Sequence, residues 1–251
     1  MSSAKIAAVP RSVPFALLLP PSEGKAEGGA GPPWSPAAGR FGEALGPLRA
    51  TIVEALAAVD GGSQRLLGVG GRHLERARAA NVSLLGAPTL PAGRRYTGVV
   101  WDHLDLAGLP GAARRRASAS IVVLSGLLGA VGVDDPVPGY RLKIGASLPP
   151  LGVLARWWRP ALSDVLDEFL TRRVVVDLLP NDHASAWVPR SDRYRAHVKV
   201  AFVERSGKVA GQDAKAAKGL LARHIVLEGG DPRASIETFA HDRFEVRAGE
   251  S

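Results

Sequence analysis

The sequence predicts a mixed α/β protein in which one central mixed sheet is flanked by helices. Apolar runs at residues 17–19 and 121–124 have the length and the unbroken apolar character of buried strands, and residues 174–179 form a third run that only Asp177 interrupts. Segments with apolar residues at helical spacing lie between these runs. Because strands that alternate with helices are typical of this fold class, we expect the three runs to share one sheet.

The remaining elements can be assigned in chain order. Pro20 and Pro21 end the first strand, because proline cannot continue the hydrogen bonding of a central strand. Residues 26–40 are rich in Gly, Pro and Ala and predict a loop. The pattern then predicts helices at residues 41–59, 112–119, 157–169 and 214–227, a short strand running into a helix at 96–104, strands at 198–203 and 236–246, and a hairpin turn at 206–208.

Length and composition indicate a globular protein with a sizeable core. The chain has 251 residues, of which 46% are hydrophobic, and it shows neither a repeat nor a linker. We therefore expect one domain over residues 14–247, preceded by a loose N-terminal extension at 1–13. The sequence has no cysteine, which excludes disulfides, thiolate catalysis and cysteine-ligated metal sites.

The chain is strongly basic, with a formal net charge of +8 and a pI near 10.3. Such a surplus favours DNA or another polyanion as the partner, although an Arg-rich and Ala-rich composition also follows from a GC-rich genome. The longest apolar run, at residues 121–133, is too short to span a membrane. The N-terminus lacks the uninterrupted apolar core of a signal peptide, so we expect a cytoplasmic protein without a membrane partner. The sequence indicates no oligomeric state.

A glycine-rich turn opens a helix at residues 66–77. The alternation of apolar residues and glycines resembles the hairpin of a helix–hairpin–helix DNA-binding element, which would lie within residues 45–80. Glycines let backbone N–H groups approach a phosphate, and the N-terminus of the new helix favours an anion. The same pattern also fits a turn packed between two helices. The candidate DNA-binding residues are Gly68, Gly70, Gly71, Arg72, Arg76 and Arg78.

Polar side chains gather near the predicted ends of strands and helices, where sheets of this class bind ligands. Arginine can grip an anion with two parallel hydrogen bonds and lysine supplies a point charge, so the set suits an anionic ligand. If the protein is an enzyme, the catalytic candidates are Glu23, Lys25, Tyr140 and Arg141. The ligand-binding candidates are Ser22, Tyr96, Thr97, Ser125, Lys215 and Lys218. We expect Ser22, Glu23, Lys25, Tyr140, Arg141 and Lys215 to line one pocket.

Neither a metal nor a cofactor is expected. The six histidines show no pair at metal-binding spacing, and the adjacent acids Asp134 and Asp135 precede a proline in what we interpret as a solvated turn. The Walker pattern of nucleotide-binding loops is incomplete, because Leu19 occupies the position of its first glycine. A nucleotide remains a candidate ligand if the cleft is that of an enzyme.

Five motifs in order resemble the YaaA family of peroxide-stress proteins, over roughly residues 15–228. They are P-P-S-E-G-K from Pro20 to Lys25, Y-T-G from Tyr96, L-S-G-L-L-G from Leu124, Y-R-L from Tyr140 with Gly145, and a late group formed by Lys215, Lys218, Gly219 and Arg223. The resemblance implies a YaaA-like fold, DNA binding and a role in the oxidative stress response.

One block departs from the family pattern. Residues 179–183 read Leu-Pro-Asn-Asp-His, where the family has L-x-S followed by a small or acidic residue and Tyr. Two hypotheses follow from the whole sequence. In the first, the protein is a YaaA-like DNA-binding protein. In the second, it is an enzyme that uses the polar residues for an anionic or nucleotide-like substrate, and the block at Pro180–His183 reflects a changed substrate.

Overall fold

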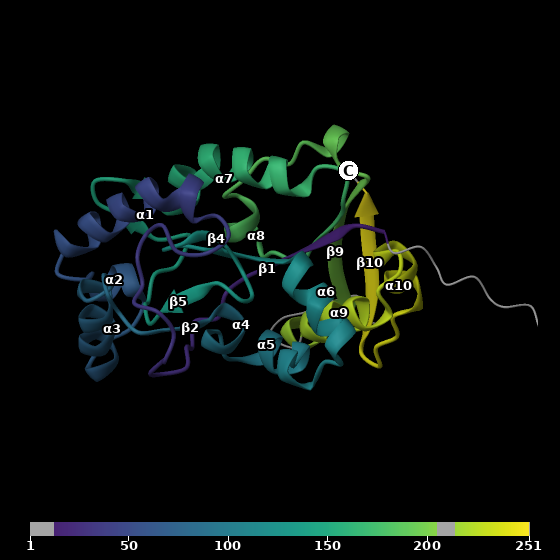
Figure 1. Cartoon of the computed structure of the whole chain (residues 1–251), viewed down its shortest axis with the longest axis horizontal. Helices are drawn as coiled ribbons and strands as arrows, with labels where there is room; N and C mark the ends of the chain where they lie inside the picture. Colours follow the sequence, from purple (N-terminus) through teal and green to yellow (C-terminus); the bar gives the residue numbers. More distant parts are fainter. Residues whose placement is uncertain (1–12, 205–213, 251) are drawn as a thin grey trace, which may run out of the picture.

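A six-stranded mixed sheet in the order β10-β9-β8-β1-β3-β4 runs through the molecule (Figure 1). The computed structural model describes residues 13–204 and 214–250. The four inner strands are parallel, and β4 and β10 pair antiparallel at the two edges. The strands are β1 (Phe15–Leu19), β3 (Ile121–Ser125), β4 (Gly129–Gly132), β8 (Val174–Asp177), β9 (Ala196–Glu204) and β10 (Phe244–Glu250).

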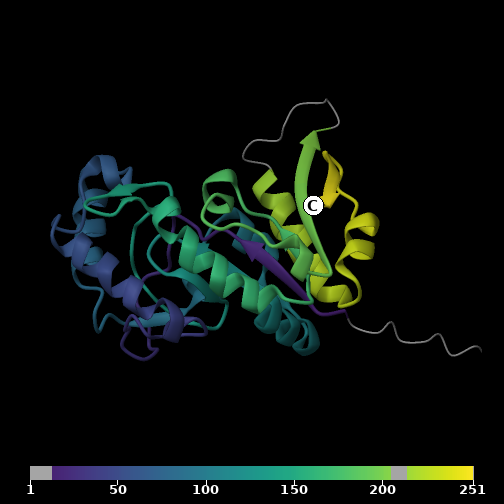
Figure 2. The same cartoon turned by 90° about the horizontal axis from the view of Figure 1, so that it is seen from above.

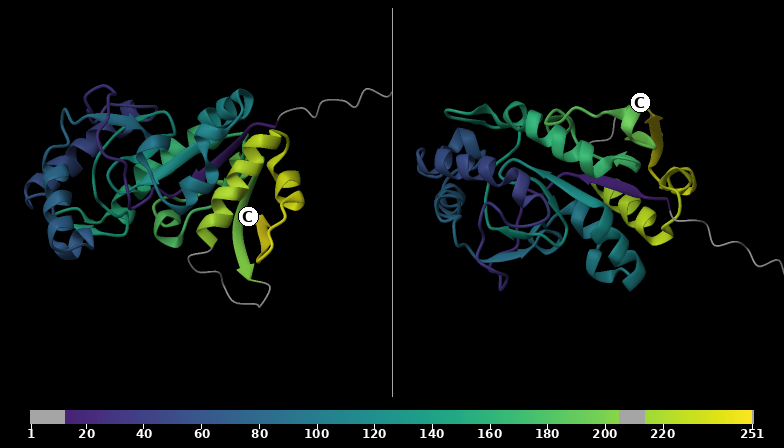
Figure 3. Two further views of the ribbon diagram at one scale, coloured as in Figure 1. Left: turned by 90° about the horizontal axis from the view of Figure 1, so that it is seen from below. Right: turned by 45° about the horizontal axis from the view of Figure 1, so that its top comes forward.

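The middle of the sheet is buried on both faces. Every residue of β1, β3 and β8 is buried, as expected for parallel strands that are covered by helices on either side. Helix α7 (Leu154–Leu170) covers one face, and α6 (Gly111–Ser120) and α9 (Ala214–Glu228) cover the other (Figures 2 and 3). The predicted α/β class with one mixed sheet is therefore confirmed.

A second, smaller group of elements lies beyond β4, at the opposite end of the molecule from β9 and β10 (Figure 1). It contains α1 (Gly42–Ala57), α2 (Gln64–Leu67), α3 (Arg72–Val82), β2 (Thr89–Pro91) and β5 (Pro136–Pro138). The other described elements are α4 (Ala92–Arg95), α5 (Val99–Leu104), η1 (Leu106–Gly108), β6 (Ser147–Leu148), β7 (Gly152–Val153), α8 (Asn181–Ala184), η2 (Ser191–Arg193) and α10 (Pro232–Thr238).

Arg49 joins this smaller group to the sheet. Its guanidinium is fully buried and donates to the carbonyls of Leu128 and Ala130 in the β4 region, and to those of Pro36 and Ala38 in the preceding loop. Burial lowers the pKa of Arg49 to about 10, so the side chain is charged at neutral pH. One buried cation therefore fixes α1 against the edge of the sheet.

Two expectations about elements are wrong. Residues 236–246 do not form a continuous strand region, because α10 (Pro232–Thr238) occupies its start and β10 begins only at Phe244. Asp231 caps α10 by accepting from the backbone N–H of Arg233 at 3.0 Å, and Pro232 opens the helix. Tyr96 makes an isolated bridge with Lys25 rather than a strand that runs into α5. The turn expected at 206–208 and most of the N-terminal extension lie outside the described residues.

In the described part of the chain, no helix combines the length and the apolar character needed to cross a membrane.

Candidate functional site

A cavity of about 210 Å³ lies at the carboxyl ends of the central parallel strands. Strands β8, β1 and β3 are neighbours and end at the same edge of the sheet, and the segments that follow β1 and β8 turn into the cavity wall. We call this cavity the cleft. It is lined by Pro21, Ser22, Glu23, Lys25, Tyr140, Arg141, Leu142, Lys143, Ile144, Gly145, Asp182 and His183.

The segment after β1 is held in place by pairing with the segment after α4. The Ala26 N–H donates to the Arg95 carbonyl at 2.9 Å, and the Thr97 N–H donates to Ser22 Oγ at 2.9 Å. Arg95 is buried and also donates to the carbonyls of Val137, Ala26, Gly28 and Pro88. The P-P-S-E-G-K and Y-T-G motifs are therefore in direct contact.

Lys25 lies over the ring of Tyr140. Its Nζ is 4.1 Å from the centre of that ring and 5.7 Å from the centre of the Tyr96 ring, and it donates to the Ser22 carbonyl at 3.0 Å. Burial lowers the pKa of Lys25 to about 7, and the nearby Arg141 cation adds to this effect. At neutral pH, Lys25 is thus divided between its charged and neutral forms.

A chain of three hydroxyls stands behind Lys25. The Tyr140 hydroxyl is 2.6 Å from Ser125 Oγ and 3.0 Å from the Tyr96 hydroxyl, and all three residues are buried. Burial raises the pKa of Tyr140 to about 12 and that of Tyr96 well above its ordinary value. Both phenols therefore stay protonated, and the chain fixes the ring against which Lys25 packs.

Glu23 binds two cations at the mouth of the cleft. Its carboxylate accepts from Arg141 Nη2 at 2.8 Å and lies 2.9 Å from Lys143 Nζ. The hydrogen bond from Lys143 and the charge of Arg141 lower the pKa of Glu23 against the opposing effect of burial. The three groups together carry one net positive charge, at a point that is open to solvent.

Gly126 allows the Arg141–Ile144 segment to form one wall of the cleft. A side-chain Cβ at this position would lie 2.7 Å from the Leu142 carbonyl oxygen and 2.8 Å from the Ile144 nitrogen. Any larger residue would push the cleft wall away from β3. The L-S-G motif therefore shapes the cleft in two ways. The Ser125 hydroxyl holds the Tyr140 hydroxyl, and the missing side chain of Gly126 leaves room for the cleft wall.

The divergent block after β8 supplies the remaining wall. It forms α8, and both Asp182 and His183 line the cleft. Burial lowers the pKa of His183 to about 4, the Lys218 cation acts in the same direction, and Asp182 opposes both. Among the described residues, His183 Nδ1 has no hydrogen-bond partner. No group of three metal-binding side chains occurs in residues 13–204 and 214–250.

The late motif does not reach the cleft. Lys215 is exposed on the first turn of α9, and Lys218 donates to the Leu178 carbonyl at 2.8 Å, outside the cavity wall. Gly219 lets α9 approach α5 closely, since a Cβ there would lie 2.3 Å from the Val100 carbonyl oxygen. Arg223 donates to the carbonyls of Leu104 and Asp105. We therefore correct the expectation that Lys215 lines the same pocket, because its motif holds α9 in place instead.

A groove of about 540 Å³ continues from the cleft towards α3. Glu23, Lys25, Tyr140 and Arg141 line both spaces, and the groove extends along α3 to Arg76. The predicted hairpin forms the end of this groove. It consists of the four-residue α2, a turn with positive φ at Gly68 and Gly71, and α3.

Hydrogen bonds join the hairpin to the cleft wall. Arg141 Nε donates to the Leu67 carbonyl at 3.0 Å, and the Asn81 side chain accepts from the Arg141 N–H at 2.9 Å and donates to its carbonyl at 2.9 Å. Arg72, Arg76 and Arg78 are all exposed on α3, and Arg78 Nε also donates to the Gly62 carbonyl at 2.7 Å, in the turn that follows α1. The groove and the cleft therefore form one continuous surface.

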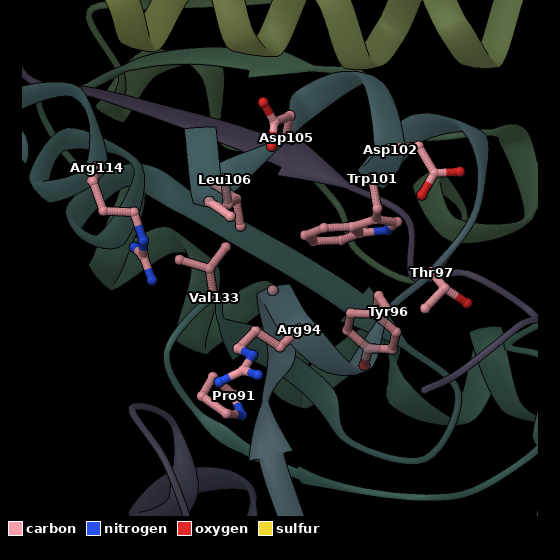
Figure 4. A pocket seen from close by; sticks show the side chains of 12 residues that line it. Pro91, Arg94, Tyr96, Thr97, Trp101, Asp102, Asp105, Leu106, Arg114 and Val133 are labelled. Carbon is pink, nitrogen blue, oxygen red and sulfur yellow. The ribbon is translucent and has the colours of Figure 1, made fainter. Parts of the chain in front are cut away.

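Tyr96 and Thr97 are not among the residues that line the cleft or the groove; they border a separate cavity of about 490 Å³ (Figure 4). Trp101, Leu106 and Val133 form its apolar side, and Arg94 and Arg114 reach towards it from other elements. Thr97 thus faces this second cavity, while its N–H supports Ser22 in the first.

The sequence did not single out three charged or polar residues of the cleft, namely Lys143, Asp182 and His183. Lys143 comes directly after the Y-R-L motif, and this position was the sequence signal that could have placed it in the cleft. Asp182 and His183 were visible as a departure from the family pattern, but their place in the cavity depends on how β8 ends beside β1.

The fold and the cleft define an α/β protein with a polar cavity at the carboxyl ends of parallel strands, joined by a groove to a glycine-rich helical hairpin. Comparison with known proteins identifies the family within this class. The family model described as Peroxide stress protein YaaA matches residues 16–250. The chain therefore belongs to the YaaA family.

Relatives of similar length support this assignment. The UPF0246 protein of Streptomyces coelicolor is 38% identical over 226 residues, which cover 88% of this chain and 86% of the relative. A UPF0246 protein of Corynebacterium glutamicum is 32% identical over 216 residues, covering 84% of each chain. A second one, from another strain of that species, is 31% identical over 229 residues, covering 89% of this chain and 90% of the relative.

Proposed function

We propose that this protein binds DNA through the surface formed by the hairpin, the groove and the cleft, and that it acts in the response to peroxide stress. The link to peroxide stress comes from the family's name. The observation that carries DNA binding is the attachment of the hairpin to the cleft wall, through the hydrogen bonds of Arg141 and Asn81. This attachment puts the basic residues of α3 and those of the cleft on one surface.

The charges on this surface suit a phosphodiester chain. Arg72 and Arg76 are four residues apart on α3, so their side chains share one face of the helix. Arg76 forms an ion pair with Glu27, but both side chains are well exposed and such a pair is weak in water. A phosphate can replace Glu27, and the net charge of +8 favours the approach of a polyanion. Arg141 and Lys143 extend the basic surface into the cleft.

DNA affinity is expected to fall steeply with salt. About four phosphate contacts, from Arg72, Arg76, Arg141 and Lys143, imply about a 100-fold loss of affinity between about 50 and 200 mM salt. Gel-shift titrations of duplexes of unrelated sequence check this, and they are expected to give similar affinities because phosphate contacts carry no sequence information. An affinity that does not respond to salt would contradict the proposal.

A second candidate function is favoured by one specific observation, the partly neutral Lys25 beside a protonated tyrosine. Such a lysine can act as a base or a nucleophile on an anionic small molecule, for example a nucleotide, that is held by Arg141 and Lys143. The ligand would occupy the cleft and leave the groove empty. A screen of nucleotides by thermal shift separates this function from DNA binding.

Replacing Arg141 by lysine is expected to impair either function. The guanidinium binds Glu23 and the Leu67 carbonyl at the same time, and lysine cannot reproduce this planar, two-sided contact. We expect about tenfold weaker binding of DNA or of the anionic ligand, as for the loss of a charge-assisted hydrogen bond. The matched control is Arg156→Lys, at an exposed position on α7. Equal binding by both variants would show that Arg141 has no part in ligand binding.

A further inference from the structure

Lys25 stands between the cleft and the groove and lines both. Any chain molecule that lies along the groove and enters the cleft must therefore pass Lys25. Arg141 lines both spaces as well, but its guanidinium is engaged by Glu23, and Lys143, which also binds Glu23, lines the cleft alone.

The ion pairs of the described residues leave Lys25 without a carboxylate partner. Glu23, the nearest acid in sequence, is held by Arg141 and Lys143, and Lys25 Nζ donates only to the Ser22 carbonyl among the described residues. An ammonium group in this position is poorly stabilised, so a large share of Lys25 is neutral near pH 7. The charged and titratable groups around it are Glu23, Arg95, Arg141, Tyr96 and Tyr140.

We propose that Lys25 is a nucleophile that forms an imine with an aldehyde carried on a DNA backbone, as at an abasic site. The inference rests on the proposed DNA binding and names the substrate of that surface. The groove favours a DNA-borne aldehyde over a small one, because it continues from Lys25 along α3 and can hold the flanking backbone. Arg141 and Lys143 supply charge for a neighbouring phosphate.

The chemistry balances without a further reactant. The Lys25 Nζ lone pair attacks the aldehyde carbon, the carbonyl π electrons move to oxygen, and a proton passes from nitrogen to that oxygen to give a carbinolamine. The hydroxyl then takes up one proton from solvent, the C–O bond breaks, the oxygen leaves as water, and a protonated imine remains. The Tyr140 ring, 4.1 Å from Nζ, faces this cation and stabilises it.

His183 is placed to transfer the proton. It lines the same cleft, its low pKa of about 4 keeps it neutral at neutral pH, and its Nδ1 has no hydrogen-bond partner among the described residues. A neutral imidazole can take the proton from the attacking nitrogen and deliver it to the alkoxide oxygen, which gives the carbinolamine. Tyr140 is excluded from this role because its hydroxyl is held between Ser125 and Tyr96.

The test is reductive trapping. The full-length protein is incubated with a duplex that carries one abasic site and with sodium cyanoborohydride, and the covalent adduct is measured on a denaturing gel. Peptide mass spectrometry then locates the modified lysine in the wild-type protein, so the test does not depend on how a variant folds. We expect the adduct to form on Lys25. In Lys25→Arg, the adduct yield is expected to fall at least about tenfold below that of the wild type. Lys199→Gln, which removes an exposed lysine on β9, is expected to leave the yield unchanged.

The pH profile gives a second readout. Attack needs the neutral amine, so the yield is expected to rise through pH about 7 and then level off. A yield that keeps rising to about pH 10, as for an ordinary lysine, would overturn the assignment. So would an adduct located on another lysine, or an unchanged yield in Lys25→Arg.

Two further arms separate this inference from the proposed function. Binding of intact duplex is measured in parallel by gel shift. If the protein binds intact DNA but forms no adduct with abasic DNA, imine formation is overturned and the proposed DNA binding stands. No shift of intact DNA contradicts the proposed function and this inference with it. Glyceraldehyde 3-phosphate supplies a small phosphate-bearing aldehyde, and an adduct with it but not with abasic DNA overturns the DNA substrate.

Discussion

Replacing Arg49 by leucine is expected to lower the free energy of unfolding by about 3 to 5 kcal/mol, because a hydrogen bond to a charged group contributes about 1.5 to 3 kcal/mol. Arg49 donates to four carbonyls that belong to two separate segments, and leucine provides no donor for any of them. Relief from burying the guanidinium charge offsets part of the loss, since burial already lowers the pKa of Arg49 to about 10.

Urea unfolding of the two proteins measures this difference. The control is Arg156→Leu, at an exposed position on α7, where we expect a change of less than about 0.5 kcal/mol. If Arg49→Leu were as stable as its control, Arg49 would not be what fixes α1 and the preceding loop to the sheet.

His183 is expected to make the folded protein sensitive to acid. Its pKa is about 4 in the folded protein and near 6.5 in an unfolded chain, so the unfolded chain binds the proton first. Stability attributable to this group is complete above pH about 6.5 and is lost as the pH falls towards about 4. After allowance for partial solvent exposure, we expect about 2 kcal/mol of this loss to come from His183.

The comparison of wild type with His183→Gln isolates this effect. Between pH 7 and pH 4, the variant is expected to lose about 2 kcal/mol less of its free energy of unfolding than the wild type does. His73→Gln removes an exposed imidazole from α3 and serves as the control. Parallel pH curves for the wild type and His183→Gln would mean that the imidazole is hydrated in the folded protein.

The central strands could be predicted because burial on both faces favours runs of apolar residues, as in β1, β3 and β8, where only the terminal Ser125 and Asp177 are polar. The cleft could be predicted in part for a related reason. Prolines end β1, and the polar residues that follow it lie where parallel strands present ligands. Ser22, Glu23, Lys25, Tyr140 and Arg141 accordingly line one cavity, although more than 100 residues separate the two groups in sequence.

The rest depends on contacts that are distant in sequence. Lys143 reaches Glu23 only because Gly126 lets the cleft wall approach β3, and His183 enters the cleft only because β8 pairs with β1. Lys215 belongs to a motif that serves helix packing, and the motif's spacing does not distinguish packing from ligand binding. The signal for helix α10 was the capping Asp231 followed by Pro232, which was not used when residues 236–246 were assigned to a strand region.

The most direct test of DNA binding by the hairpin, groove and cleft compares two double variants with equal loss of charge. Arg72→Ala with Arg76→Ala removes two exposed charges from α3, and Arg115→Ala with Arg156→Ala removes two from the exposed sides of α6 and α7. In gel-shift titrations, the α3 variant is expected to bind DNA about tenfold more weakly than wild type, with a salt slope reduced by about 2. The control variant is expected to bind within about twofold of wild type, and both should keep the wild-type melting temperature within about 2 °C. Equal affinities for the two variants, or a large fall in melting temperature of the α3 variant alone, would contradict the account.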